Sequence, residues 1–245
     1  MRVLELWRYP VKSLQGERLE VATVTTAGLE GDRRFALFDI DTGFGLTARR
    51  APELLFAAAR LRDDGGVDIT LPDGSVARDD TALSAWLGRR VELRSADVQL
   101  TRQYENVADF EDEDASEWGP FEGAGGAFHD SGRTRVSLVS TATTGTWDPR
   151  RFRANVYLDG EGEDALVGSK VALGNTVLDV VKRVGRCVMT TRPQPGGIER
   201  DLDVLRTINR ERDGSLAIGA LVMTPGAVRI GDTLEPQLHG RRCPP

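Results

Sequence analysis

Short segments of alternating or β-branched residues recur along the chain, and Gly, Pro or Asp separates most of them. Such segments are typical of β-strands joined by tight turns. We expect strands over residues 3–7, 18–26, 34–40, 67–71, 91–95, 136–140, 152–159, 170–174, 176–184, 216–223 and 228–234. So many short strands with few helices predict a mixed α/β but mainly β architecture, a barrel or a sandwich.

Two stretches have helical periodicity instead. Residues 81–88 place Leu83, Trp86 and Leu87 on one face, with Asp80 or Thr81 as the N-cap and Gly88 as the stop. Residues 201–210 place leucines and an isoleucine three apart after Asp201, which predicts a second capped helix. No repeat of fixed period accompanies them.

Between residues 106 and 132 the periodicity stops and the chain becomes acidic and rich in glycine. We expect a loop there, either an inert connector, a lid or a docking surface for a basic partner. The acidic residues concentrate in the segment 109–117.

Composition excludes several classes of protein. The formal net charge is -6, so we expect no nucleic-acid partner, and no run of about twenty apolar residues suggests a membrane span. The chain has two cysteines, Cys187 and Cys243, and two histidines, His129 and His239, too few for a disulfide framework or a structural zinc site. We therefore expect a cytoplasmic protein.

Familiar catalytic motifs are weak here. Residues 43–48 match GxGxxA, but Pro52 follows too soon for the long helix that a dinucleotide fold needs. The pair His129–Asp130 leaves a hydrolase open, although a loop histidine is the simpler interpretation.

Basic residues cluster near turns in three segments, YPVKS (9–13), GDRRF (31–35) and TARR (47–50). Their guanidinium groups suit a phosphate or carboxylate, or are surface charges worth little. Three of the 32 basic residues are lysine, and Lys12 is one of them. In the strand expected over residues 152–159, Arg153 and Asn155 would share one face, which suits a polar ligand or a solvated outer face equally.

Cys187 follows Arg186 and precedes a Thr-Thr-Arg run. A small buried hydrophobe is the commonest role of such a cysteine. Neighbouring cations instead favour the thiolate, which attacks electrophiles or binds soft metals.

Taken together, YPVKS, GLEGDRRF, LTARR, VSLVST, DPRRFRANVYLDG, RVGRCVMTT and PGAVRIGDTL resemble the MOSC family, named after the C-terminal domain of molybdenum cofactor sulfurase. More narrowly, the chain resembles the two-part branch that includes the mitochondrial amidoxime-reducing component and its bacterial relatives. The resemblance implies an N-terminal β-barrel-like subdomain, which we expect over residues 1–95, packed against a MOSC β-barrel, which we expect over residues 133–236. The acidic, glycine-rich composition predicts a connector between them (96–132), and the Pro-Pro ending predicts a flexible tail (237–245).

The resemblance also implies the molybdenum cofactor, molybdopterin with molybdenum, bound between the two parts. Cys187 would be the catalytic thiolate and metal ligand. The cofactor contacts that the motifs carry over are Lys12, Ser13, Arg33, Ser140, Thr141, Arg153, Asn155 and Arg186. An anionic cofactor fits converging cations and hydroxyls, and a compact lysine ammonium suits phosphate.

From the resemblance we expect a reductase that removes oxygen from N-hydroxylated compounds such as hydroxylamines, amidoximes or N-hydroxylated bases. Electrons would come from a separate protein, a ferredoxin, a flavin reductase or a cytochrome-type donor. A non-catalytic cofactor carrier and a persulfide-transfer module are the alternatives, because the same thiolate serves all three. After Cys187 the sequence departs from the family pattern at Arg192, Gln194 and Gly197, so substrate or partner choice would differ.

Overall fold

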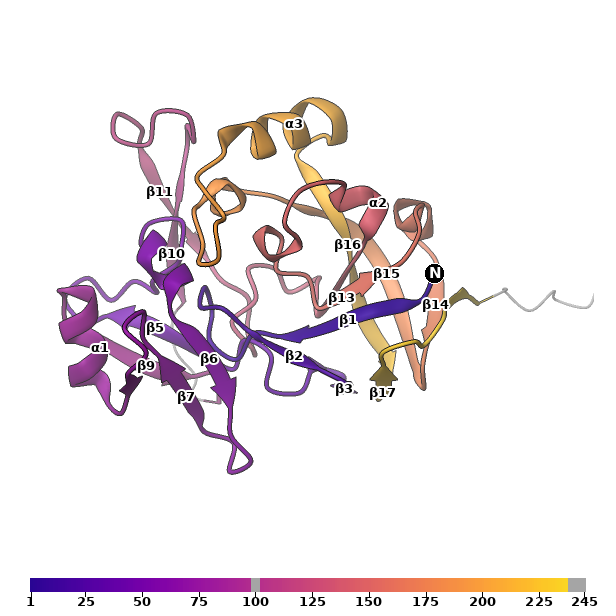
Figure 1. Ribbon diagram of the computed structural model, residues 1–245, viewed down its shortest axis with the longest axis horizontal. Helices are drawn as coiled ribbons and strands as arrows, with labels where there is room; N and C mark the ends of the chain where they lie inside the picture. Colours follow the sequence, from indigo (N-terminus) through magenta and orange to yellow (C-terminus); the bar gives the residue numbers. More distant parts are fainter. Residues whose placement is uncertain (98–101, 238–245) are drawn as a thin grey trace, which may run out of the picture.

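One large curled sheet dominates the computed structural model, which describes residues 1–97 and 102–237 (Figure 1). Its eight strands follow the order β18-β14-β15-β16-β12-β13-β1-β2. Their bounds are β1 Val3–Arg8, β2 Glu17–Leu19, β12 Val136–Ser140, β13 Val156–Leu158, β14 Lys170–Leu173, β15 Thr176–Gly185, β16 Ser215–Thr224 and β18 Leu234–Pro236. N-terminal strands thus complete a sheet built mostly from the C-terminal half.

The main core lies against this sheet. Leu138, at the centre of β12, is opposite Val156 on one side and Ile218 on the other, and all three are fully buried. A three-stranded sheet of β17 (Gly226–Arg229), β3 (Val21–Thr25) and β4 (Gly28–Leu29) contributes further side chains to the same core. The expected mainly β class is confirmed.

Smaller sheets form the N-terminal part around a second apolar core. One pairs β5 (Phe35–Asp39) with β9 (Val91–Ser95); the other contains β6 (Ala58–Leu61), β7 (Val67–Thr70) and β8 (Val76–Ala77). Helix α1 (Asp80–Leu87) buries Leu83 and Leu87 there, and a short 3-10 helix, η1 (Pro52–Phe56), precedes β6. The N-cap of α1 is Asp79, one residue before the predicted cap, and Gly88 ends the helix with φ of 62°.

Helix α3 (Leu202–Arg212) confirms the second predicted helix, with Asp201 as its N-cap. Its buried face packs with Leu216 of β16 in a third core cluster. The remaining short helices are α2 (Thr141–Thr144), η2 (Pro149–Arg151), η3 (Glu163–Leu166) and η4 (Val188–Thr191). Among the described residues, no helix combines the length and the apolar character that a bilayer span requires.

The stretch 106–132 is more regular than expected. Strands β10 (Gln103–Val107) and β11 (Trp118–Glu122) form an antiparallel hairpin in which Tyr104 is directly opposite Phe121. Their rings lie 5.6 Å apart, and such cross-strand aromatic pairs stabilise hairpins. The prediction of an irregular loop was therefore wrong for the seven strand residues that lie within 106–132, and it holds for the acidic tip between the two strands.

Three predicted strands were too long. The segment 18–26 bends at Glu20 and enters two different sheets, and the segment 228–234 breaks at a turn where Gly231 has φ of 90°. In the segment 152–159 the strand includes Val156–Leu158 alone, and Arg153 has a left-handed φ of 50°. Arg153 and Asn155 therefore do not share a strand face. Cys243 and, apart from Gln237, the predicted tail lie outside the described residues.

Candidate functional site

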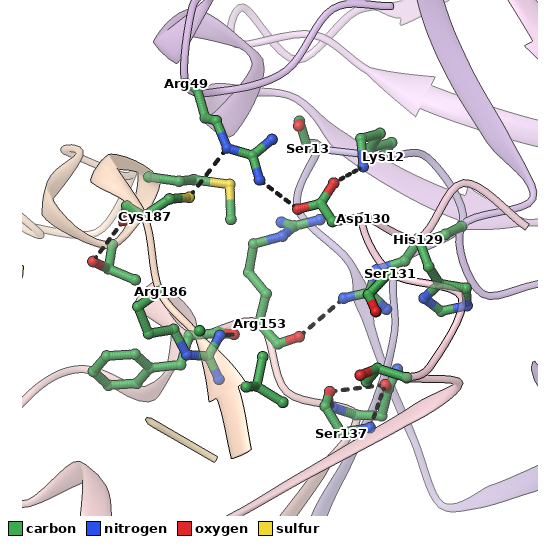
Figure 2. Close-up of a pocket in the computed structure, with 18 of the residues that line it drawn as sticks. Lys12, Ser13, Arg49, His129, Asp130, Ser131, Ser137, Arg153, Arg186 and Cys187 are labelled. Carbon is green, nitrogen blue, oxygen red and sulfur yellow. Dashed lines mark hydrogen bonds and ion pairs between the residues drawn. The ribbon is translucent and has the colours of Figure 1, made fainter. Parts of the chain in front are cut away.

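A cavity of about 290 Å³ lies where the two parts of the chain meet, and Cys187 lies in its wall (Figure 2). N-terminal segments contribute Lys12, Ser13, Arg33 and Arg49. The segment that leads into β12 contributes His129, Asp130 and Ser131, and the end of β15 leads directly to Arg186 and Cys187. Residues far apart in sequence thus converge because β1 and β13 pair in one sheet.

Cations dominate the cavity. Its basic lining residues are Lys12, Arg33, Arg49, Arg153, Lys182 and Arg186, whereas Asp130 is its one acidic residue within the described parts of the chain. Such an excess of positive charge in a partly enclosed space attracts an anion with several negative groups. The arginines add planar donors that suit phosphate.

The Cys187 sulfur accepts one hydrogen bond, from Arg49. The distance from Arg49 Nε to Cys187 Sγ is 3.3 Å. Cys187 immediately precedes η4, and its carbonyl oxygen accepts bonds from both the backbone and the hydroxyl of Thr190, each at 3.0 Å. Burial alone would lower the pKa of Arg49, but its interactions with Cys187 and Asp130 outweigh burial, so the pKa is raised above its usual range.

Asp130 links two of the cations. Its carboxylate accepts from Lys12 Nζ and from Arg49 Nη2, as the dashed lines in Figure 2 show. Burial opposes ionisation of this carboxyl, but the charges of Lys12 and Arg49 prevail and hold the pKa of Asp130 well below its usual range. Asp130 is therefore ionised at neutral pH and unable to donate a proton there.

Lys12 is held from three sides. Besides Asp130, its ammonium donates to the carbonyl of Phe128 at 3.0 Å and lies 4.7 Å from the centre of the Tyr104 ring. Burial lowers the pKa of Lys12, and Asp130 opposes that shift. The neighbouring Ser13 hydroxyl accepts from the backbone N–H of Ala48 at 3.0 Å, which ties this segment to the one that carries Arg49.

Backbone strain concentrates at the cavity. Of the five described non-glycine residues with positive φ, Ser13 (70°), Arg33 (52°) and Arg153 (50°) line it. Such conformations are costly and typically occur at functional sites. Arg33 Nη2 donates to the carbonyl of Arg153 at 3.1 Å, and both guanidinium groups lie over the ring of Tyr9, at 5.0 and 4.3 Å.

Hydrogen bonds hold the Arg186 side chain beside Cys187 and use two of its three nitrogens. Its Nε donates to the carbonyl of Leu216 at 2.7 Å and its Nη1 to the carbonyl of Phe152 at 2.8 Å. The buried Nη2 has no partner among the described residues. Burial lowers the pKa of Arg186 to about 10, so it remains a cation at neutral pH.

His129 and Asn155 complete the wall in different ways. Burial lowers the pKa of His129 to about 3, with help from Arg33, and its Nε2 has no partner in the described chain. The amide oxygen of Asn155 accepts from the backbone and the hydroxyl of Ser137, at 3.1 and 3.0 Å. Asn155 thus holds Ser137 at the cavity, and His129 stays neutral at pH 7.

The structure brings seven of the nine predicted site residues to one cavity: Lys12, Ser13, Arg33, Arg153, Asn155, Arg186 and Cys187. Ser140 and Thr141 do not join them. Ser140 is fully buried as the N-cap of α2, where its hydroxyl accepts from Thr143 N at 3.3 Å, and Thr141 is exposed as the first residue of that helix. The serine of β12 that reaches the cavity is Ser137.

Sequence reasoning missed four cavity residues of consequence: Arg49, Asp130, Ser131 and Ser137. Arg49 lies in one of the basic segments noted above and Asp130 beside the noted His129, so both had a sequence signal. Neither signal indicated that Arg49 and Asp130 would contact each other or Cys187, because those contacts form only in the fold.

The donor set fits the molybdenum cofactor. Cys187 offers a soft sulfur ligand, the surrounding cations exceed the acidic residues, and Arg186 Nη2 is a buried donor that an anionic group could engage. Small-molecule pockets typically have about 300–1,000 Å³, so the cavity, at about 290 Å³, is at the small end of that range.

The fold and the site define a mainly β protein with a cation-rich cavity beside the one cysteine of the described residues. Residues 1–114 match the MOSC N-terminal beta barrel domain, and residues 129–235 match the MOSC domain. The chain therefore belongs to the two-part MOSC family, whose members are associated with binding of the molybdenum cofactor. The predicted boundaries at residues 95 and 133 stay predictions.

Solved structures resemble the chain only distantly. The YuaD protein from Bacillus subtilis is 13% identical, with coverage of 96% of this chain and 93% of that one and a TM-score of 0.42. YiiM from Geobacillus stearothermophilus is 17% identical, with coverage of 44% and 57% and a TM-score of 0.36. A third structure, of a hypothetical protein, is 11% identical, with coverage of 96% and 67% and a TM-score of 0.42. None of the curated proteins compared with the chain matches it.

Proposed function

We propose that this protein is a molybdenum-cofactor-dependent reductase of N-hydroxylated compounds, with Cys187 as the protein ligand of the metal. The observation that carries the proposal is the placement of the one described cysteine within a cavity rich in cations. The family's association with the cofactor and the resemblance of the motifs to the amidoxime-reducing branch supply the reaction class.

The protein's own residues bind and orient the cofactor. Lys12 and Arg33 from the N-terminal part and Arg153 and Arg186 from the MOSC part line the same cavity as Cys187, so together they would bind an anionic cofactor. Arg49 donates to the sulfur and limits the orientation of the Cys187 side chain. When bound, the cofactor supplies two-electron oxygen-atom chemistry.

The overall reaction balances with an external reductant. The N-hydroxyl substrate takes up two electrons and two protons, its N–O bond breaks, and an amine and water leave. A separate electron-carrier protein would supply the electrons. At neutral pH Asp130 is a carboxylate and His129 is a neutral imidazole, because the pKa of Asp130 lies well below its usual range and that of His129 is about 3, so neither is a ready acid. The protons would therefore come from solvent or substrate.

Multiple turnover tests the proposal against a carrier or persulfide-transfer role. Protein from a host that makes the cofactor is mixed with a chemically reduced viologen and benzamidoxime, and benzamidine is measured. A reductase releases many equivalents of benzamidine per chain, and Cys187→Ala releases none above background. At most one equivalent from molybdenum-loaded wild type would overturn the reductase and favour a carrier.

A further inference from the structure

The hairpin of β10 and β11 supports the cavity without lining it. No residue between 103 and 122 belongs to the cavity wall. Aromatic rings of the hairpin nevertheless lie against two cations of that wall. Tyr104 lies 4.7 Å from Lys12, and the centre of the Phe121 ring lies 5.2 Å from the Arg49 guanidinium. In Figure 1 the hairpin rises beside the segment between Cys187 and α3.

The acidic tip of the hairpin is paired with that segment. Glu111 accepts from Arg206 of α3 at 2.8 Å, and both side chains are nearly half exposed. Glu113 differs, because its side chain is 12% exposed and it accepts from both Arg192 and Arg200. The buried pair of Glu113 with Arg192 is therefore much less screened by water than the pair formed by Glu111.

Arg192 connects Glu113 to the Cys187 site. Its Nη1 and Nη2 donate to the two oxygens of Glu113, and Nη2 also donates to the backbone carbonyl of Arg49. The Arg49 side chain then donates through Nε to Cys187 and through Nη2 to Asp130. Hydrogen bonds thus connect the hairpin tip to the backbone of Arg49, and the side chain of the same residue contacts the sulfur.

We propose that Glu113 is a positioning residue for the Cys187 site, and that it acts by holding Arg192 against the Arg49 backbone. Without the carboxylate, Arg192 would be a buried cation without its partner and would turn toward water. Arg49 would lose the donor to its carbonyl, and its guanidinium would no longer stay beside the sulfur. This inference rests on the proposed function in one respect, that Cys187 is taken as the metal ligand.

The side-chain N–H of Arg49 reports this positioning directly. In the full-length cofactor-free protein, the Nε–H resonance of Arg49 is assigned by its loss in Arg49→Lys, and its exchange with water is measured by NMR. Glu113→Gln is expected to accelerate that exchange about tenfold or more, as loss of a charged hydrogen bond allows. Glu111→Gln is the matched control and is expected to leave it unchanged.

A folding probe and a second variant distinguish loss of positioning from detachment of the whole hairpin. The indole N–H of Trp118 donates to the carbonyl of Glu113 at 3.3 Å, so its resonance reports whether the tip is folded. Arg192→Lys keeps the charge beside Glu113 but cannot also reach the Arg49 carbonyl with a planar fork. It is expected to accelerate Arg49 exchange as Glu113→Gln does, and the double variant should add little more.

The outcome separates this inference from the proposed function. Unchanged Arg49 exchange in both Glu113→Gln and Arg192→Lys, with the Trp118 signal intact, would overturn the positioning role. If the wild type binds molybdenum, the molybdenum-loaded Glu113→Gln variant should also release the metal about tenfold faster than the loaded Glu111→Gln variant does. Wild type without molybdenum would refute the proposed function, and the NMR result would still decide the role of Glu113.

Discussion

Arg49 Nε lies 3.3 Å from Cys187 Sγ across 138 positions of sequence, while Nη2 of the same guanidinium donates to Asp130. One planar group thereby fixes the sulfur relative to a carboxylate that also binds Lys12. The thiol is therefore part of a charged network that joins both parts of the chain.

Removal of the Arg49 side-chain donor is expected to weaken cofactor binding. A hydrogen bond to a charged group contributes about 1.5–3 kcal/mol, so Arg49→Met should release the cofactor about 10- to 100-fold faster than wild type. The release is measured as molybdenum remaining after timed dialysis. Arg50→Met is the control, because Arg50 is about half exposed and lies on the ring of Trp118, outside the cavity wall. Equal release from both variants would contradict this role of Arg49.

His129 makes stability depend on pH in the mildly acidic range. The unfolded chain protonates this imidazole near pH 6.5, whereas burial lowers the pKa of folded His129 to about 3. Between these values only the unfolded chain binds the proton, so stability present above pH 6.5 is lost as the pH falls toward 3. The contribution is at most about 1.4 kcal/mol per pH unit.

Denaturant unfolding at pH 7, 6, 5 and 4 measures this dependence. His129→Gln is expected to have a flatter curve than wild type, with the difference growing toward pH 4. Parallel curves would show that His129 takes up its proton over the same pH range in the folded and the unfolded chain, against a lowered pKa in the folded protein.

Ser140 is expected to matter for stability rather than for cofactor binding. Ser140→Ala removes the N-cap of α2 and should lower the free energy of unfolding by about 1 kcal/mol. Molybdenum content per folded chain should equal that of wild type, because Ser140 is absent from the cavity wall. Loss of metal without loss of stability would restore the role that the family motif suggested.

The sequence was most informative where periodicity or local caps decide the structure. Alternation placed β5 and β9 within a residue or two, and Asp201 correctly predicted the start of α3. The hairpin strand Gln103–Val107 was missed because its alternation is short and an acidic tip follows it. Local pattern also failed at Arg153, whose left-handed backbone precedes the strand, so that the strand begins at Val156 and not at residue 152.

For the site residues too, local sequence patterns predicted some positions and gave no information on others. The motifs identified Cys187, Lys12 and Arg33, because their family pattern is local. The five residues of β12 are all buried, so burial alone does not reveal that Ser137 rather than Ser140 faces the cavity. The contacts from Arg49 to Cys187 and from Glu113 to Arg192 join distant segments, and no local pattern encodes them.

Molybdenum and pterin content tests the central claim most directly. Wild type and Cys187→Ala are purified from a host that makes the cofactor, and both components are quantified per chain by elemental mass spectrometry and by fluorescence of the oxidised pterin. We expect about one molybdenum and one pterin per wild-type chain, and in Cys187→Ala either loss of the metal or loss of its thiolate coordination in X-ray absorption spectra. Wild type that carries neither molybdenum nor pterin would contradict the account.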